Sequence, residues 1–302
     1  MAARTAPRTA TRIEVARTAR IRQLTDRAEA RTRMLTADAF SAYALAYVDR
    51  RFFPLADFFE ATIGDGWGLV MHARGGLGLS TLTLGNTEAV SSILKLHPGP
   101  RQTFVTCKAA HVDQLLVTHN LWRPQSMLRM RVTRDSFRAA TSTTAVRRLI
   151  DADADDLNRL YAIEGDGLHY SGRQVEEGIY FGVHVRGKLV AAAGTHIHSL
   201  AEGVGVIGNV FTHPDHRGHG YGTGVTGAVA EYLLRRCDLV VLNVDPANRT
   251  ARHVYESLGF TEAGRLVEAM ATRREATTPL PLLRRTLARW RAHSPGLEVV
   301  RL

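Results

Sequence analysis

The sequence contains few cysteines and lysines and no long apolar run. Cys107 and Cys237 lie far apart and form no CxxC pair, which argues against a disulfide framework or a structural zinc site. No stretch approaches the roughly 20 consecutive apolar residues of a membrane-spanning helix, and no apolar segment follows the N-terminus as in a secretory signal. We therefore expect a cytoplasmic protein with no membrane partner.

The composition is that of an ordinary globular protein. With 45% hydrophobic and 23% charged residues, 26 glycines and 10 prolines, the chain has neither the low hydrophobicity of a disordered protein nor the glycine period of a fibre. A length of 302 residues predicts two domains at about 150 residues each.

The net charge of +10 is concentrated at the two ends of the chain. Residues 1–33 carry a net charge of +6 and residues 271–302 a net charge of +5, whereas the residues between them sum to −1. Only three of the 39 basic residues are lysines, a bias more typical of a GC-rich genome than of phosphate contacts. We expect a basic flexible arm over 1–33 and a basic extension over 271–302. Nucleic-acid binding through these tails and an organellar transit peptide are alternatives.

Apolar periodicity divides the remaining chain into two α/β units, 34–140 and 146–270, joined near 141–144. In the first unit it predicts a helix over 34–48, a second helix through Phe58 and Phe59, and two more over 87–96 and 111–122. The strands predicted in this unit are 69–71, 77–84, 103–107 and 127–132. In the second it predicts helices over 155–162, 220–236 and 248–258, with strands over 146–150, 179–185, 188–196, 204–212, 239–244 and from 260. Both units end in the order strand, helix, strand, helix, strand, which suggests a degenerate duplication of one fold.

The most informative segment is the loop after the strand 204–212. Gly218, Gly220 and Gly222 alternate between Pro214 and the predicted helix. Unpaired backbone amides and the dipole at such a helix N-terminus can bind a phosphate or pyrophosphate, and Arg217 can add a charged hydrogen bond. The spacing fits neither the dinucleotide fingerprint nor the P-loop. Close packing alone is the structural alternative.

A second motif follows about thirty residues later, in Asn248, Ala251, Tyr255, Gly259 and Phe260. Together with the R-x-x-G-x-G loop of Arg217 to Gly222, it resembles the signature of the GNAT superfamily of acyl-CoA-dependent N-acetyltransferases. The resemblance covers about 146–270 and implies a GNAT fold there. The paired architecture resembles the glycine N-acyltransferase-like branch, with a degenerate GNAT-like first half.

The resemblance implies a site for acetyl-CoA between two splayed parallel strands and direct attack by an amine on the thioester. It assigns the pyrophosphate to the loop residues Arg217, Gly218, His219, Gly220, Tyr221, Gly222 and Thr223. It assigns the thioester to strand residues Val210, Phe211 and Thr212, with a backbone amide of Val210 or Phe211 facing the carbonyl oxygen. Asn248 would bind the pantetheine arm, and Tyr255 would protonate the departing thiolate unless it is a core aromatic. In the first unit, Gly85 and Glu88 stand where the loop would be, so we expect no tight second site there.

One position departs from the family pattern. Members with a direct base often carry Glu on the bulged strand, where this chain has Asn209, which cannot accept a proton at neutral pH. The base would then be water or another side chain, or would be unnecessary for an amine that arrives unprotonated. Candidate side chains are Glu164, Asp166, His196 and His198, each of which could equally be a surface or packing residue. His213, His216 and His219 recur every three residues, but Pro214 and the glycines exclude the regular helix that metal ligands at this spacing need, so we expect no metal.

The predicted function is transfer of an acetyl or other acyl group from CoA to a small-molecule or peptide amine, with the first unit covering one side of the acceptor pocket. A non-catalytic acyl-CoA sensor, favoured by Asn209, and a nucleic-acid-binding protein are the alternatives. The acceptor, the acyl chain length and the oligomeric state, including a homodimer, stay open.

Overall fold

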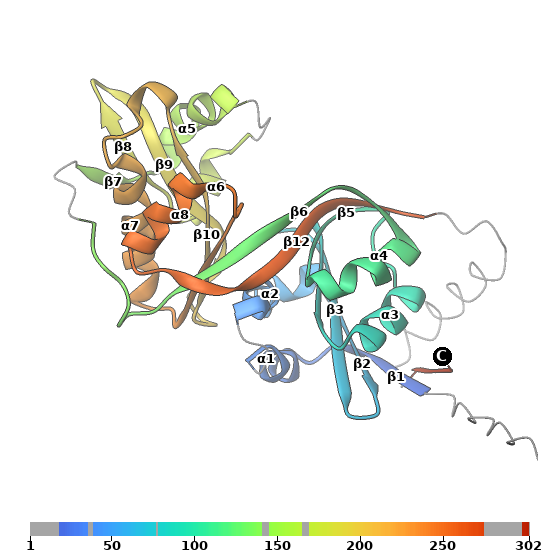
Figure 1. Ribbon diagram of the computed structural model, residues 1–302. Coiled ribbons are helices and arrows are strands. Elements are labelled where there is room, and N and C mark those ends of the chain that lie inside the picture. The colour runs from blue at the N-terminus through green and yellow to red at the C-terminus, as the bar shows by residue number, and fades with distance from the viewer. Residues whose placement is uncertain are drawn as a thin grey trace, which may run out of the picture.

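The computed structural model describes residues 18–35, 39–76, 78–140, 145–164, 169–274 and 298–301. They form one 13-stranded mixed sheet with helices on its faces (Figure 1), the mixed α/β class that the sequence predicted. Among these residues no helix combines the length and the apolar composition of a membrane span.

The sheet runs in the order β13-β1-β2-β3-β4-β5-β12-β6-β11-β10-β9-β8-β7. Its strands are β1 (Thr18–Leu24), β2 (Ala56–Ile63), β3 (Gly66–Arg74), β4 (Leu79–Gly85), β5 (Gln102–Cys107), β6 (His119–Val132), β7 (Val146–Arg148), β8 (Phe181–Val185), β9 (Lys188–Ser199), β10 (Val204–Thr212), β11 (Leu239–Val244), β12 (Thr261–Arg273) and β13 (Glu298–Arg301). The helices are α1 (Arg27–Leu35), α2 (Ala42–Tyr47), α3 (Thr87–Leu96), α4 (Val112–Thr118), α5 (Ala154–Tyr161), α6 (Gly172–Glu177), α7 (Tyr221–Leu234) and α8 (Arg249–Ser257).

Two long strands join the N-terminal half, before the 141–144 junction, to the C-terminal half after it (Figure 1). β6 belongs to the first half but pairs with β11 of the second, from Val132 with Val240 to Leu128 with Val244. β12 belongs to the second half but pairs with β5 of the first. Because each half supplies a strand to the other, the two halves form one continuous sheet.

Each half contains a parallel strand pair connected through a helix. β4 and β5 are parallel with α3 between them, and β10 and β11 are parallel with α7 between them. α3 begins where the Asn86 side chain accepts a hydrogen bond from the Ala89 amide at 3.1 Å, which satisfies one of the free donors at a helix start. It buries Val90, Ile93 and Leu94 against the sheet.

Several predicted elements differ from the structure. Residues 18–33, expected in a flexible arm, form β1 and most of α1. Residues 56–63, expected to be helical, form β2, because the apolar run around Phe58 fits either period and its pairing with β1 and β3 is not local. The helix expected over 111–122 ends at Thr118, and its last residues begin β6. Residues 1–17 and 275–297 lie outside the described residues.

The arginines of β1 and α1 are used in ion pairs with buried glutamates. Arg22 and Arg33 pair with Glu60, which is 3% exposed. Arg27 and Arg31 pair with Glu202 of the C-terminal half at 2.8 and 2.7 Å. These side chains hold α1 against both halves, so this part of the basic segment is structural.

Candidate functional site

The parallel strands β10 and β11 pair only over their first residues. Their ladder runs from Val204 with Leu239 to Ile207 with Leu242 and continues no further. β10 then bulges against β9 between Gly208 and Phe211, which leaves Asn209 and Val210 outside that ladder as well. The two strands therefore separate where the sequence placed the thioester, with backbone amides at the opening.

Asn209 adopts a left-handed backbone conformation with φ of +53°, an uncommon one for a residue other than glycine. Two tyrosines hold it there. The Tyr161 hydroxyl donates to the Asn209 carbonyl oxygen at 2.6 Å, and Asn209 Nδ2 donates to the Tyr180 hydroxyl at 3.0 Å. Asn209 therefore builds the bulge. The role of these two tyrosines could not be predicted from the sequence, because no local pattern links them to β10.

The glycine loop leads from β10 into α7. Gly218 and Gly220 have φ of +79° and +75° with open space where a Cβ would stand, so glycine serves their backbone conformation and is not required by crowding. Arg217 Nε donates to the Thr212 carbonyl oxygen at 3.2 Å, and its guanidinium lies 6.0 Å from the Phe211 ring centre. α7 begins at Tyr221 with no side-chain cap, so the first-turn amides, including those of Gly222 and Thr223, are available to an anion.

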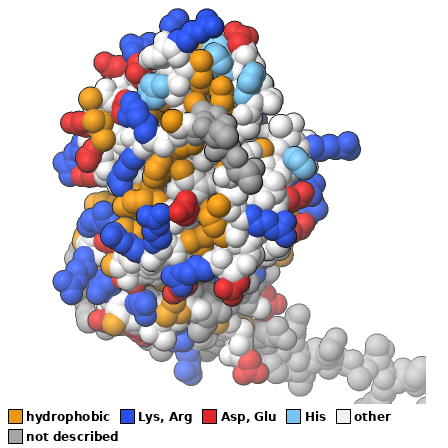
Figure 2. Space-filling view, turned by 90° about the vertical axis from the view of Figure 1, so that its left-hand side faces the viewer, with side chains coloured by type: hydrophobic (Ala, Val, Ile, Leu, Met, Phe, Trp, Pro, Cys, Tyr) orange, Lys and Arg blue, Asp and Glu red, His pale blue; other side chains and the backbone are white. Residues whose placement is uncertain are grey.

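The side chains along this loop are exposed or half-buried, and His219 Nδ1 lies 2.9 Å from the Arg217 carbonyl oxygen. Figure 2 views the end of the C-terminal half and shows basic side chains mixed with acidic ones around a band of hydrophobic ones, with histidines near its upper end. The positive charge offered at the loop itself is that of Arg217 and of the helix N-terminus.

Asn248 and Tyr255 belong to the segment that follows β11. Asn248 caps α8, and its Oδ1 accepts a hydrogen bond from the Ala251 amide at 3.0 Å. Tyr255 lies within the helix. Tyr255 is 6% exposed and packs 6.0 Å from the Phe260 ring centre. Burial raises the pKa of Tyr255 to about 12, so its hydroxyl is protonated at neutral pH and can donate a proton.

A cavity of about 570 Å³, which we call the central cavity, lies between the two halves. Its wall includes Tyr43 and Phe104 of the N-terminal half and Tyr180, His196 and Asn209 of the C-terminal half. The bulge of β10 therefore borders the cavity. A cavity of this size accommodates a small molecule.

Of the four candidate bases, His196 and His198 line this cavity. His196 Nδ1 lies 3.2 Å from the Tyr43 hydroxyl. A Cβ on Gly208 would be 2.1 Å from His196 Nε2, so the absence of a side chain at 208 lets the imidazole lie against the bulge. The ring forms part of the cavity wall, and protein surrounds its other sides. Burial lowers the pKa of His196, and the Arg129 guanidinium lowers it further, whereas a hydrogen bond with Asn209 raises it.

The other candidates are less well placed. Burial and the Arg51 guanidinium lower the pKa of His198 to about 4, and its Nδ1 lies 3.3 Å from Thr195 Oγ1. Glu164 ends a short turn after α5, but its side chain lies outside the described part of the structure, as does all of Asp166.

A buried polar network next to the cavity was not predicted. Arg129 on β6 is 0% exposed and donates from Nε to Asn243 Oδ1 at 2.7 Å, with its guanidinium 5.1 Å from the Tyr43 ring centre. Asn243 Nδ2 donates to Glu268 Oε1 at 2.6 Å. The alternation of Leu128, Met130 and Val132 assigns Arg129 to the opposite side of β6, which the sequence alone would leave to solvent. Its contacts with Tyr43 of α2 and with the Ala39 carbonyl oxygen, in the turn before α2, lie on that side.

The corresponding opening in the N-terminal half is closed by a side chain. β4 and β5 pair as far as Leu82 with Thr106. Beyond that point His111, 1% exposed, reaches from the start of α4 to Thr83 Oγ1 at 2.8 Å and to the Gly85 carbonyl oxygen at 3.0 Å. His111 precedes α4 as Asn248 precedes α8, so the position that borders an opening in one half fills it in the other.

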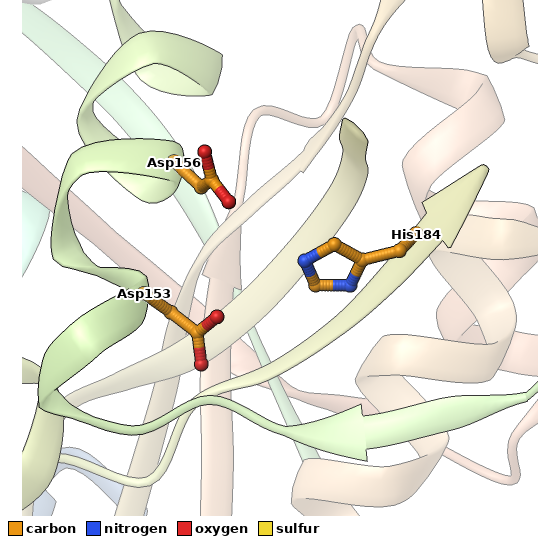
Figure 3. Close-up of side chains that lie close together, drawn as sticks. All are labelled: Asp153, Asp156 and His184. Carbon is orange, nitrogen blue, oxygen red and sulfur yellow. The ribbon is translucent and has the colours of Figure 1, made fainter. Parts of the chain in front are cut away.

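Within the part of the chain that the structure describes, one group of side chains has metal-ligand spacing: Asp153, Asp156 and His184 (Figure 3). Arg147 already occupies this group, because its guanidinium donates to both carboxylate oxygens of Asp153 at 2.8 and 2.5 Å and lies 3.2 Å from His184 Nε2. A fixed positive charge at this point opposes a cation.

The comparisons with known proteins agree with this geometry. Residues 146–260 match the model of the acetyltransferase (GNAT) family. The C-terminal half therefore resembles a GNAT acetyltransferase domain. A mycothiol acetyltransferase from Thermobispora bispora is 45% identical over 80 residues, which are 25% of this chain and 27% of that protein. The match therefore spans about a quarter of the relative's length.

Two solved structures share the fold over most of the chain. A protein from Novosphingobium aromaticivorans assigned to the GNAT acetyltransferase family has a TM-score of 0.50 and 17% identity, covering 68% of this chain and 89% of that one. A Drosophila protein has a TM-score of 0.59 and 14% identity, covering 82% and 98%. At these identities the likeness concerns the fold alone, and it extends beyond the GNAT domain.

Proposed function

We propose that the protein transfers an acetyl group from acetyl-CoA to a primary amine held in the central cavity. The observation that carries this proposal is the opening between β10 and β11, which has the glycine loop at one end and the central cavity behind its bulge. A cofactor and an acceptor could thus meet at Asn209 and Val210 from opposite sides.

The loop and α8 would hold the CoA moiety. Backbone amides from Gly218 to Thr223 and the Arg217 guanidinium face the pyrophosphate. Asn248 Nδ2 remains for the pantetheine arm, since its Oδ1 caps α8. The amide of Val210 or Phe211 would donate to the thioester carbonyl oxygen as charge develops on it.

His196 would act as the base. With its proton on Nδ1 donated to Tyr43, Nε2 carries the lone pair and accepts the proton of the attacking amine. The new C–N bond forms as the C–S bond breaks, and the departing sulfur takes the proton of the Tyr255 hydroxyl. Asn209 then does not have to accept a proton, which explains how the reaction can proceed with Asn at the position where related proteins often carry Glu.

The remaining assignments are part of the same proposal. The N-terminal half, 34–140, would bind no cofactor, because His111 fills its opening, and would supply one wall of the acceptor site. Its matching element order supports an origin by duplication of one GNAT-like fold. The mycothiol acetyltransferase relative supports acetyl as the transferred group. Its acceptor is not carried over, because the match covers 27% of that protein.

Release of free CoA thiol from acetyl-CoA in the presence of a panel of primary amines tests this function. We expect amine-dependent release that disappears in Val210→Pro, because proline removes a backbone amide from the opening. The control Val117→Thr, at an exposed position of α4, should retain the release. Binding of acetyl-CoA with no release above background for every amine would instead identify a non-catalytic sensor.

A further inference from the structure

Three large apolar side chains stand in a row on the sheet at the edge of the central cavity. Met270 on β12 pairs with Phe104 on β5 at one side and with Trp122 on β6 at the other. They are 53%, 40% and 63% exposed, respectively. Single exposed apolar side chains are common, but a contiguous set marks a binding surface. We call these three residues the apolar row.

Only one face of these strands is open. On the other face Val105 and Ala271, the strand neighbours of Phe104 and Met270, are buried in the core that α3 and α4 cover. Cross-strand partners project to the same side of a sheet, so the apolar row forms one continuous strip. Its exposure is therefore not a consequence of fraying at the sheet edge.

The apolar row is continuous with the central cavity. Phe104 belongs to both, and Glu268, two residues before Met270 on β12, also lines the cavity. Residues two apart on a strand share a face and lie about 7 Å from each other. Among the described residues Glu268 forms no ion pair and accepts a side-chain hydrogen bond only from Asn243. A carboxylate inside the cavity is thus followed, about 7 Å outward, by an apolar strip.

We propose that the acceptor is an amphipathic primary amine, an inference that rests on the proposed function. Its ammonium group approaches Glu268 and loses one proton to solvent, and His196 accepts the second proton as the C–N bond forms. Its apolar tail lies along Phe104, Met270 and Trp122. Complementarity of charge at one end and of apolar surface at the other selects for this class. A short or wholly polar amine would leave the apolar row in water.

Linear alkylamines test this inference directly, because propylamine and octylamine have nearly the same amine basicity and nucleophilicity. Only the octyl tail is long enough to pass from Glu268 to the apolar row. At about fourfold for each buried methylene, we expect wild-type kcat/KM to be at least tenfold higher for octylamine. In the Met270→Thr/Trp122→Thr double variant this preference should fall by at least tenfold.

Val117→Thr is the matched control, because Val117 is 56% exposed on α4 and does not line the cavity. It should keep the wild-type preference. Equal kcat/KM for the two amines, or a preference that survives the double variant, would overturn the inference while amine-dependent CoA release upholds the proposed function. Absence of CoA release with every amine would overturn both.

Discussion

The Tyr43 hydroxyl oxygen lies 3.2 Å from Nδ1 of His196 and joins a residue of α2 to a residue of β9 across the central cavity. Because this contact directs the other imidazole nitrogen toward the bulge at Gly208, the N-terminal half orients the side chain that we propose as the base. Both halves would then contribute to the proposed catalytic site.

Replacing His196 with Gln should lower kcat by a factor of about 10² to 10⁴, the usual contribution of a general base. In the wild type kcat/KM should fall as the pH drops through the His196 pKa, because protonated imidazole cannot accept a proton. Burial places that acid limb below pH 6.5.

The pH profile separates this role from a structural one. His196→Gln should lose the acid limb of the pH profile. Tyr43→Phe should keep that limb and lose less kcat than His196→Gln, because it removes only the contact that orients the imidazole. An acid limb that persists unchanged in His196→Gln would assign the base elsewhere.

Tyr255→Phe should reduce kcat by at least tenfold with little change in the Kd for acetyl-CoA. The pKa of about 12 keeps the hydroxyl protonated, and its loss removes the proton donor to sulfur while the packing of the ring is preserved. Steady-state kinetics and calorimetry on the same preparation provide the comparison. Unchanged turnover would mean that Tyr255 is only a core residue.

Arg217→Ala should weaken acetyl-CoA binding by about 10- to 100-fold, the range for a hydrogen bond to a charged group. Arg235→Ala is the control, because Arg235 is an exposed arginine at the other end of α7, paired with Glu231. Both Kd values can be measured by calorimetry at two salt concentrations. An equal effect of the two substitutions would indicate general attraction by positive charge.

Acid should destabilise the N-terminal half through His72, whose Nε2 donates to the His97 carbonyl oxygen at 3.0 Å and whose Nδ1 lies 2.9 Å from Thr81 Oγ1. Burial lowers its pKa to about 4, against about 6.5 in the unfolded chain. Between these values the unfolded state binds the proton and the folded state does not, so the free energy of unfolding falls as the pH decreases from 6.5 toward 4.

At pH 5 this residue alone should cost about 2 kcal/mol relative to pH 7. Urea unfolding at the two pH values measures the difference, which should be smaller in His72→Gln. His253→Gln, on the exposed side of α8, should match the wild type. Equal pH dependence in His72→Gln and the wild type would contradict the assignment.

The elements whose identity is encoded locally could be predicted from the sequence. The helix over 87–96 and the strand over 204–212 have the predicted bounds, because a cap and a clear period mark them. The loop from Arg217 to Gly222 and the helix after Asn248 could also be predicted, because the glycine spacing of the loop and the residue pattern of the helix are local.

The features that depend on distant partners could not be predicted. The arginines of α1 predicted a solvated arm, because their partners Glu60 and Glu202 lie far away in the sequence. The exchange of β6 and β12 depends on strand pairing between the halves. The central cavity, with Tyr43 and Glu268 on its wall, exists only once these strands have been exchanged.

Calorimetric titration of the full chain with acetyl-CoA tests the central claim most directly. The separation of β10 from β11 and the filling of the other opening by His111 predict one binding site per chain. The measured stoichiometry should therefore be one, with binding weakened in Arg217→Ala. No binding at millimolar acetyl-CoA, or two equivalent sites per chain, would contradict the account.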